Sequence, residues 1–509
     1  MFVLRISFPA HRYHATPWGN HVNEGHVEWP PSPWRIIRAF CSVGFTHLGW
    51  SGSPPDAFAE IVESFALHPP DYSLPDSVET HSRHYMPTPS STSKVLDTCR
   101  RISDSQAMYV RFDAELLPEA KQLLHDLATN TAYLGRAESW VDIQLANEAP
   151  NGLSWCCPSA DSMPEIGTIP TRVLSPIPES AFQGWREKTI SKRLSRVEGK
   201  PTKSQLKKAN APFPATIVDC VSVDTTFLSK HGWSQPPGSR WIQYLIPNIK
   251  QFAEVKSAMP VSDPTGTQPT TAILGLTSDS VSGRTLPPIG RALWVAEIAH
   301  SEAVRQFTKR YESLSYALSG KTQGSSPNKH MHAHFLPIDL DGDSKLDHLL
   351  VHCPAGLDFQ TQTAIASIGR IFSKKLPEIA VTWLGCGDLT LAEKHLKALA
   401  KHSCKILTAS KRFKSVTPYV ASRHLRRKYQ LSQNIADECR FRGLPEPTIT
   451  AAAPNAGKFR LSRNKESRKP PVEFGQFLTI AFDESVKAPL TLGYGSHFGL
   501  GLFEAIDDT

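Results

Sequence analysis

Several features that define common protein classes are missing from this 509-residue sequence. No run of about 18 apolar residues occurs, which excludes a membrane-spanning helix of ordinary length. The first residues show no basic segment followed by a long apolar one, so we expect no signal peptide. The nine cysteines are scattered and form no Cys-x-x-Cys pair, which argues against a disulfide framework or a structural zinc site. These absences predict a cytoplasmic protein that needs no membrane.

Positive charge is concentrated in one part of the chain. The formal net charge is +8, whereas residues 401–470 contain 17 basic and four acidic residues. This segment therefore carries +13, which leaves −5 for the rest of the chain. So concentrated a positive charge favours binding of a polyanion such as a nucleic acid. A basic face that contacts only solvent is the alternative interpretation.

The length predicts two to four domains, and local patterns indicate where some of them begin. Residues 2–8 predict a strand, and Ser32 followed by Pro33 predicts the start of a helix. Residues 186–213 are polar and basic, which predicts an exposed arm or a domain boundary. A second exposed stretch is predicted for residues 262–290, which are rich in Thr, Ser, Pro and Gly.

Short strands and helices alternate in the second half of the chain. The predicted strands are 241–246, 330–338, 346–352, 379–384, 404–409, 415–420, 448–452, 476–483 and 500–506, and the predicted helices are 292–318, 360–376 and 425–442. This order predicts an α+β fold with tandem ferredoxin-like (βαββαβ, RRM-like) domains and a C-terminal Gly-rich loop.

Three histidines within five residues form the first candidate site. His330-Met331-His332-Ala333-His334 is predicted to be part of a strand, on which the three imidazoles would share one face. Imidazoles of near-neutral pKa suit general acid–base catalysis at pH 7. A histidine strip without chemistry and a metal site are the other two interpretations. The metal site would draw on the neighbouring residues Asp339, Asp341, Asp343, Asp347, His348 and His352.

A glycine-rich stretch near the C-terminus is the second candidate: Gly493-Tyr494-Gly495-Ser496-His497-Phe498-Gly499-Leu500-Gly501. Glycine permits positive φ and a close approach of the backbone to a ligand, so N–H groups here would line a polyanion. The pattern is not Gly-x-Gly-x-x-Gly, which argues against a dinucleotide site. His497 is a candidate for a second proton-transfer group. A flexible hairpin tip without a ligand is the alternative.

The third candidate is a basic run interleaved with aromatic residues. Its candidate RNA-binding residues are Lys411, Arg412, Lys414, Arg423, His424, Arg426, Arg427 and Lys428. Phe413, Tyr419 and Tyr429 lie among them and would stack on bases.

The loop before the first predicted helix, together with the start of that helix, is the fourth candidate. Its aromatic and polar side chains suit stacking on unpaired bases and hydrogen bonding to them. They are Tyr13, His14, Trp18, His21, Asn23, Trp34, Arg35 and Arg38. The alternative is that Trp18 and Trp34 pack in the core.

Together these motifs resemble the Csb-two family of type I-U (I-G) CRISPR systems, over nearly the whole chain. The resemblance is carried by residues 12–25 (Arg-Tyr-His-Ala-Thr-Pro-Trp-Gly-Asn-His-Val-Asn-Glu-Gly), 28–35 (Glu-Trp-Pro-Pro-Ser-Pro-Trp-Arg) and 133–140 (Tyr-Leu-Gly-Arg-Ala-Glu-Ser-Trp), by His332-Ala333-His334 with Asp347-His348, and by the loop 493–501. Residues 186–290 carry little of it.

The resemblance implies a fusion of two RNA-binding subunits. Residues 1–214 would form a Cas-five-like domain that holds the 5′ handle of the guide RNA, with Arg136 among its RNA-binding residues. Residues 215–509 would form a Cas-six-like endoribonuclease domain of two ferredoxin-like units. The implied partners are CRISPR repeat RNA, the guide RNA and other subunits of a type I effector complex, and target DNA would be reached only indirectly.

The chemistry of such an enzyme needs no metal and no cofactor. The neighbouring 2′-OH attacks the phosphate while a base removes its proton and an acid protonates the leaving 5′-oxygen. We expect His334 to act as the base and His332 as the acid or orienting partner, with cations from 411–428 stabilising the transition state. Two alternatives remain: a non-catalytic guide-RNA scaffold, and a metal-dependent nuclease that uses the His/Asp cluster.

Overall fold

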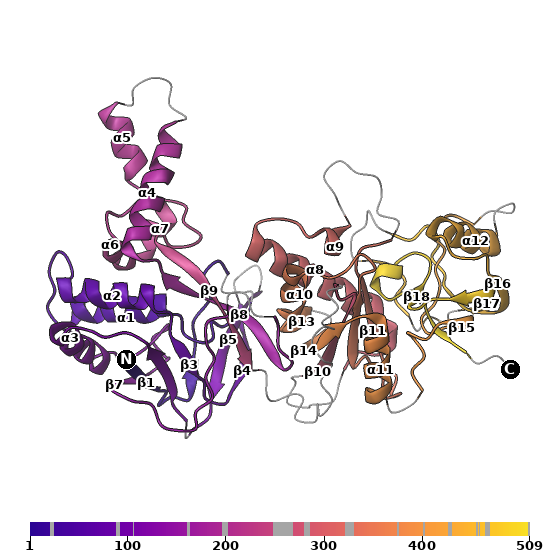
Figure 1. Cartoon of the computed structure of the whole chain (residues 1–509), viewed down its shortest axis with the longest axis horizontal. Helices are drawn as coiled ribbons and strands as arrows, with labels where there is room; N and C mark the ends of the chain where they lie inside the picture. Colours follow the sequence, from indigo (N-terminus) through magenta and orange to yellow (C-terminus); the bar gives the residue numbers. More distant parts are fainter. Residues whose placement is uncertain are drawn as a thin grey trace. The chain divides into compact units, whose positions relative to one another are not determined.

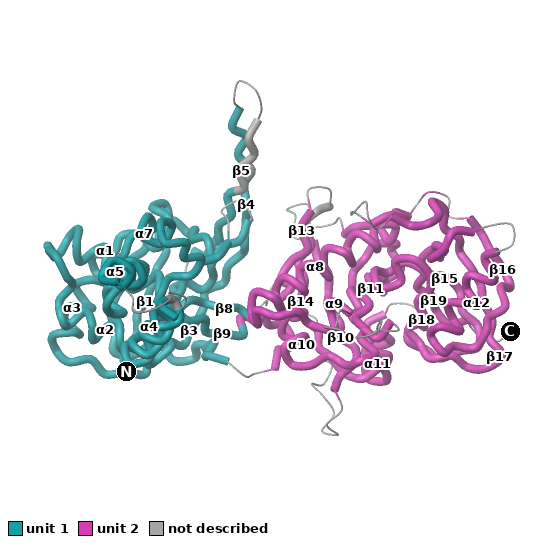
Figure 2. The backbone as a smooth tube through the Cα atoms, turned by 90° about the horizontal axis from the view of Figure 1, so that it is seen from above, with its two compact units in different colours: residues 1–161, 171–245 teal, residues 162–170, 246–509 magenta. Residues whose placement is uncertain are grey.

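The computed structural model shows two compact units (Figures 1 and 2): residues 1–161 with 171–245, and residues 162–170 with 246–509. The structure describes residues 1–20, 25–87, 92–104, 106–159, 163–195, 202–247, 268–278, 286–320, 330–373, 376–400, 403–425, 430–454, 457, 459–463 and 469–506. Within them, no helix is both long and apolar enough to cross a membrane. The mixture of helices and antiparallel sheets confirms the predicted α+β class.

Unit 1 is built around a four-stranded antiparallel sheet with the order β3-β6-β1-β7. A β2-β5-β4 sheet and a β8-β9 pair accompany it. The elements from β1 to β9 are β1 (Phe2–Ser7), β2 (Arg12–Tyr13), α1 (Pro33–Thr46), α2 (Asp56–Leu67), β3 (Asp71–Ser73), β4 (Ser77–Pro87), β5 (Thr92–Ile102), β6 (Met108–Phe112), α3 (Pro118–Thr129), β7 (Asp142–Ala146), β8 (Thr168–Pro176), α4 (Glu179–Leu194), α5 (Lys203–Asn210), α6 (Ile217–Ser222), α7 (Thr225–Lys230) and β9 (Ser239–Pro247).

Helix α1 begins as the sequence predicts. The Ser32 hydroxyl accepts a hydrogen bond from the backbone N–H of Arg35, and Pro33 occupies the first turn, where no N–H partner is needed. Its apolar side, including Ile36, Ile37 and Phe40, is fully buried. The predictions of β1 and of this helix are confirmed.

The predicted boundary between residues 214 and 215 is wrong, because residues 171–245 all belong to unit 1. Ile217 and Cys220 of α6 are buried. Tyr244 of β9 donates a hydrogen bond to the carbonyl of Pro70 at 2.8 Å and packs edge-on against Tyr72. The contacts of Tyr244 attach β9 to the N-terminal sheet, and α6 packs against α1 and α2.

Unit 2 contains two five-stranded antiparallel sheets, β11-β12-β10-β14-β13 and β16-β17-β15-β19-β18. Its elements are β10 (Thr271–Ser278), η2 (Ile289–Arg291), α8 (Ala292–Tyr311), α9 (Tyr316–Ser319), β11 (His334–Ile338), β12 (His348–His352), α10 (Phe359–Ala366), β13 (Arg370–Ser373), β14 (Leu376–Gly387), α11 (Leu389–Leu399), β15 (Ser410–Ser415), α12 (Leu431–Arg442), β16 (Thr448–Pro454), β17 (Gln476–Val486), β18 (Leu490–Thr491), η4 (Ser496–Phe498) and β19 (Leu502–Ala505).

The two sheets of unit 2 share one connection pattern. In the first, β10, α8, β11, β12, α10 and β14 follow one another, and β10 lies between β12 and β14. In the second, β15, α12, β16, β17 and β19 follow, and β15 lies between β17 and β19. The Gly-rich loop, residues 493–501, together with η4 stands where the first sheet has its second helix.

Several predictions of secondary structure are wrong, among them the end of the predicted helix 360–376, where residues 370–373 form strand β13. The stretch 262–290 is predicted to be exposed, but residues 271–278 form the buried central strand β10. The side chains of β10 pack on both faces of the sheet, so its sequence has no alternating pattern that would indicate a strand. Neither 404–409 nor 415–420 is a strand; the strand between them is β15. Tyr419 pairs with Gln476 as an isolated bridge, and the carbonyls of Pro418 and Val420 accept from the Gly-rich loop.

A short segment that ends within β8 belongs to unit 2 although unit 1 surrounds it in the sequence. The N–H of Gly167 donates to the carbonyl of Trp383 at 3.1 Å. The carbonyl of Pro170 accepts hydrogen bonds from the guanidinium of Arg310 and the hydroxyl of Ser367. Residues 162–170 therefore contribute polar contacts to unit 2.

Candidate functional site

Four imidazoles meet in unit 2 and form the histidine cluster: His330, His332, His334 and His497. The ring of His497 stacks on that of His332, with centroids 3.8 Å apart and planes 6° from parallel. Its centroid also lies 3.8 Å from that of His334. Nδ1 of His330 lies 2.7 Å from Nε2 of His497, so one of these nitrogens donates to the other. The sequence placed three of these residues in one site, and the structure brings them together.

The geometry that joins them is not the predicted strand. Strand β11 begins only at His334, and His330 has a left-handed backbone with φ of 64°. His330 and His332 therefore lie on an irregular segment, which the N–H of Ala333 ties to the carbonyl of Ala317 at 2.7 Å. The prediction that the three imidazoles share a face of a strand is wrong, and His497 is what bridges them.

His334 is the most enclosed member of the cluster. Its side chain is buried, Nδ1 lies 3.1 Å from the hydroxyl of Thr491, and Nε2 lies 3.3 Å from the carbonyl of His330. Both ring nitrogens thus have partners inside the protein. His332 differs, because its buried Nδ1 has no hydrogen-bond partner. The ring of His332 is partly exposed and less committed within the protein than that of His334, whose two nitrogens both have partners.

Burial keeps the cluster neutral at physiological pH. Desolvation, with a smaller contribution from Arg442, lowers the pKa of His330 to about 4. Desolvation lowers the pKa of His332 to about 4 as well, with His300 adding to it. The pKa values of His334 and His497 also lie well below the usual value, mainly through burial. Neutral imidazoles can accept protons, so the cluster suits a base better than an acid.

Arg442 and Glu438 of α12 support the Gly-rich loop, and sequence reasoning missed them as site residues. The two side chains form an ion pair and are about 10% exposed each. The Arg442 guanidinium donates to the hydroxyl of Ser496 at 3.2 Å and to the carbonyl of Thr491. The Glu438 carboxylate accepts the N–H of Gly493 at 2.9 Å. Their spacing of four residues on a helix looks like an ordinary surface pair in the sequence.

The Gly-rich loop has a packing role that the sequence did not reveal. Gly493, Gly495, Gly499 and Gly501 all have positive φ, between 57° and 89°. A Cβ on Gly501 would lie 1.8 Å from the carbonyl oxygen of Leu492. Most of the loop N–H groups are used inside the protein: those of residues 493, 494, 496, 498, 500 and 501 donate to protein oxygens. The predicted polyanion cradle of N–H groups is therefore wrong for these positions, while Tyr494 and Ser496 keep side-chain contacts to Arg463 and Arg442.

The basic run is only partly a free surface. Lys411, Lys414, Arg423 and His424 are exposed, and Arg412 is half-buried. Lys414 pairs with Glu504 at 3.3 Å, and Arg423 lies 3.9 Å from Asp437. Arg426, Arg427, Lys428 and Tyr429 lie outside the described residues. Phe413 and Tyr419 are buried in the core of the second sheet, so the prediction that they stack on bases is wrong.

In unit 1, several predicted RNA-binding residues are structural. Tyr13 and Trp34 are fully buried. His14 is buried between two carboxylates, with Nδ1 2.7 Å from Glu138 and Nε2 3.2 Å from Asp97. For Tyr13, His14 and Trp34 the prediction of direct base contact is wrong, because burial leaves them no surface to offer. His21 and Asn23 lie outside the described residues.

The arginines of this region serve the fold first. Arg35 forms an ion pair with buried Glu28 at 2.7 Å and donates to the carbonyl of Thr16. Arg38 donates to the carbonyls of Val221 and Val223. Arg136 is exposed and lies 3.5 Å from Asp97.

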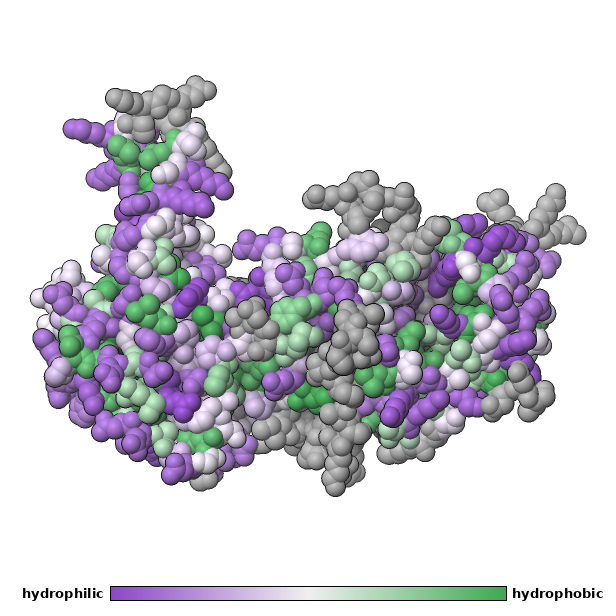
Figure 3. All heavy atoms as spheres, in the orientation of Figure 1, coloured by the Kyte–Doolittle hydropathy of each residue, from purple (hydrophilic) through white to green (hydrophobic). Residues whose placement is uncertain are grey.

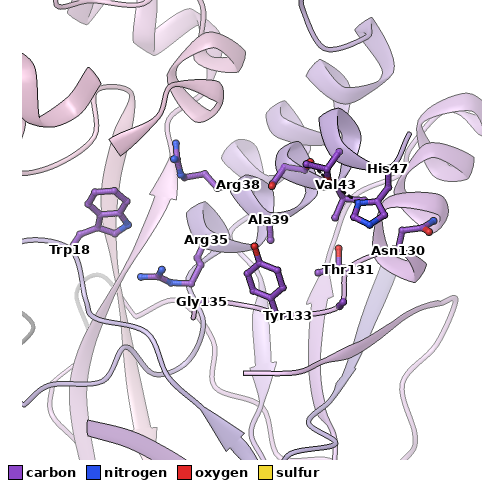
Figure 4. Close-up of a pocket in the computed structure, with 13 residues that line it drawn as sticks. Trp18, Arg35, Arg38, Ala39, Val43, His47, Asn130, Thr131, Tyr133 and Gly135 are labelled. Atoms are coloured by element: carbon purple, nitrogen blue, oxygen red, sulfur yellow. Dashed lines mark hydrogen bonds between the residues drawn. The ribbon is translucent and has the colours of Figure 1, made fainter. Parts of the chain in front are cut away.

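One pocket in unit 1 nevertheless collects Trp18, Arg35 and Arg38 (Figure 4). Its volume is about 360 Å³, within the range of small-ligand pockets. The indole N–H of Trp18 is buried without a partner, and the ring of Tyr133 is about half exposed. An aromatic ring, a donor without a partner and two guanidinium groups around one space suit a nucleobase with its phosphate.

Acidic residues at the β11–β12 turn form the one described group with close metal-ligand spacing. Ligand atoms of Asp339, Asp341 and Asp347 lie within 4.8 Å of one another, a spacing that the histidine cluster does not meet among the described residues. The Asp347 carboxylate accepts the N–H of Leu340 at 3.0 Å, and Asp339 accepts that of Ser344 at 2.8 Å. These hydrogen bonds close the β11–β12 hairpin turn, which gives its acidic residues a structural role.

Comparison with known proteins adds little to this geometry. No protein-family model and no curated protein matches the chain. Among solved structures it resembles a protein described as the product of a Cas6-related gene from Pyrococcus furiosus, with 9% sequence identity and a TM-score of 0.26. The match covers 47% of this chain and 100% of that chain. A likeness of this size transfers neither fold nor activity.

Proposed function

We propose that unit 2 binds RNA and cleaves it without a metal ion, through attack of a 2′-OH on the neighbouring phosphate. The observation that carries the proposal is the convergence of four neutral imidazoles from two segments far apart in the sequence. Such cleavage needs a base at the 2′-OH and an acid at the leaving 5′-oxygen, which one imidazole cannot supply at the same time.

The geometry favours a different assignment of roles from the one expected from the sequence. His332 is the proposed base, because its ring is partly exposed and its Nδ1 makes no hydrogen bond within the protein. His330, whose Nδ1 bonds to Nε2 of His497 and whose ring is partly exposed, is the proposed acid. His334 and His497 are positioning residues, since both ring nitrogens of each bond within the protein and the two rings pack together. Lys411, Lys414 and Arg423 would contact phosphates.

The biological role we propose is that of the guide-maturation subunit of a type I-U (I-G) CRISPR complex. The strand orders of unit 2 support two tandem ferredoxin-like folds, in which the Gly-rich loop replaces the last helix of the second. The Csb-two motifs support the family. On this proposal the chain works in the cytoplasm and keeps the guide RNA after cutting.

Unit 1 would hold the 5′ handle of the guide. The pocket lined by Trp18, Arg35, Arg38 and Tyr133 supports this role, because it offers stacking surfaces and donors in one space. The residues that line this pocket take the place of the wider set of loop residues that the sequence predicted to bind RNA.

A non-catalytic RNA scaffold is the second candidate, and one observation favours it. The pKa values of the cluster are low, so little imidazolium exists at pH 7 to act as the acid. A scaffold would bind repeat RNA through the same surface and leave cutting to another nuclease.

One experiment separates these candidates. Purified protein is incubated with end-labelled repeat RNA in EDTA, alongside His332→Gln and the matched control His125→Gln, which changes an exposed histidine of unit 1. We expect cleavage to a 2′,3′-cyclic phosphate and a 5′-OH, lowered about 10²- to 10⁴-fold in His332→Gln alone. Binding without cleavage would establish the scaffold. Cleavage that stops in EDTA and returns with a divalent ion would establish the metal-dependent nuclease.

A further inference from the structure

Helices α4 and α5 form an arm that projects from unit 1 (Figure 1). Its base is fixed by an aromatic cluster of Phe182, Trp185, Phe213 and Trp233, whose neighbouring ring centroids lie 5.5–6.2 Å apart. The Arg186 guanidinium adds a hydrogen bond to the carbonyl of Pro214 at 2.9 Å. Packing where the arm joins unit 1 therefore holds the arm in its projecting position.

The surface of the arm is basic. Residues 186–210 contain nine basic and two acidic residues. Five lysines of the arm are exposed: Lys188, Lys192, Lys203, Lys207 and Lys208. Helix α5 has no buried residue, and the arm is largely hydrophilic in Figure 3.

These lysines have no ion-pair partner within the described part of the chain. Other lysines of the chain do, since Lys345, Lys397 and Lys414 each pair with a nearby carboxylate. Lys188 and Lys192 are four residues apart on α4, as Lys203 and Lys207 are on α5. Like charges at this spacing repel one another, so the arrangement destabilises the isolated arm. A bound polyanion would remove that repulsion.

We propose that the arm docks on the phosphate backbone of duplex DNA without reading its sequence. Residues 186–210 contain no aromatic residue, which disfavours single strands, where bases stack on aromatic rings. Lysine supplies point charges that contact phosphates rather than base edges. A helix with its side chains is about 10–12 Å wide and matches the roughly 12 Å major groove of B-form DNA, while the narrow groove of duplex RNA excludes it.

This docking surface shares no residue with the histidine cluster, so it is tested without cleavage. In the full chain, Lys188, Lys192, Lys203, Lys207 and Lys208 are changed together to Gln. The matched control changes five exposed lysines elsewhere to Gln, namely Lys121, Lys230, Lys394, Lys397 and Lys487. Binding to a DNA duplex of about 30 base pairs is followed by fluorescence anisotropy between about 50 and 200 mM salt.

We expect the arm variant to flatten the slope of log K against log salt by up to about 4.5, at about 0.9 per lost phosphate contact. The control should keep the wild-type slope, and five Lys→Arg changes in the arm should restore it. Wild-type protein that does not bind the duplex, or an arm variant that behaves like the control, would overturn the proposal. A larger loss on an RNA duplex of the same sequence would overturn the choice of DNA. An unchanged melting temperature in the arm variant shows that the lost binding does not come from unfolding.

Discussion

Acidification tests the proposed base most directly. An ordinary histidine base, with a pKa near 6.5, loses its catalytic form as the pH falls below neutrality. Burial holds the pKa of His332 at about 4. The imidazole must be neutral to accept the 2′-OH proton, so lowering the pH from 7.5 to 5.5 should leave the base intact.

The expected difference is about tenfold. At pH 5.5 a group with a pKa of about 4 is about 97% neutral, whereas one with a pKa of 6.5 is about 9% neutral. The acid becomes more populated as the pH falls, so the single-turnover rate at pH 5.5 should be no lower than at pH 7.5.

The lowered pKa of His332 also makes the folded protein less stable as the pH falls. Between pH 6.5 and about 4, His332 is mostly protonated in the unfolded chain and mostly neutral in the folded protein. Stability is thus complete above pH 6.5 and falls as the pH drops towards 4, by at most about 1.4 kcal/mol for this group at pH 5.5. The partial exposure of His332 makes the real loss smaller.

The assay measures cleavage of labelled repeat RNA in EDTA at pH 5.5, 6.5 and 7.5, with the melting temperature recorded at each pH. His332→Gln supplies the baseline without the base. A rate that halves near pH 6.5 and falls about tenfold at pH 5.5, while the protein stays folded, would refute the assignment of a buried base of low pKa.

Three further predictions concern the packing around the sites. His334→Ala should lower both the cleavage rate and the melting temperature, because its ring bonds to Thr491 and packs on the cluster; a loss of rate alone, seen in kinetics and calorimetry together, would restore it as the base. Gly501→Ala should destabilise unit 2 far more than Gly232→Ala destabilises unit 1, since both have positive φ but only the first Cβ would strike backbone; equal drops in melting temperature would contradict this. Trp34→Ala should cost about 3–5 kcal/mol of stability, whereas Trp18→Ala should weaken binding of guide RNA at an unchanged melting temperature, with anisotropy and thermal unfolding as the two measurements.

The sequence identified the histidine cluster because imidazoles are rare enough for three in five residues to stand out. Which of them is accessible could not be predicted. His334 is closed off by Thr491, a residue 157 positions away, and its hydroxyl contact depends on how β18 ends beside β11. A hydrogen bond between residues so far apart in the sequence depends on the tertiary fold.

Local patterns were most informative where a single element carries the signal. The Ser32 cap and the apolar face of α1 were predictable, because both depend on neighbouring residues. Strand β10 was not, since a strand buried on both faces has no alternation. The N-terminal aromatics were misassigned for a similar reason, because the local sequence does not decide between a surface and a core position, and Tyr13 of β2 and Trp34 of α1 are both fully buried.

The excursion of residues 162–170 into unit 2 has a consequence for dissecting the protein. The chain passes between the units three times, after residues 161, 170 and 245, so a cut after residue 245 leaves residues 162–170 of unit 2 covalently attached to unit 1. A fragment that starts at residue 246 would lack the carbonyl of Pro170, and the Arg310 guanidinium and Ser367 hydroxyl would lose an acceptor. Adding residues 162–170 back as a separate peptide should therefore raise the melting temperature of that fragment. The two parts of this chain are interlaced in sequence, unlike two proteins joined end to end by one linker.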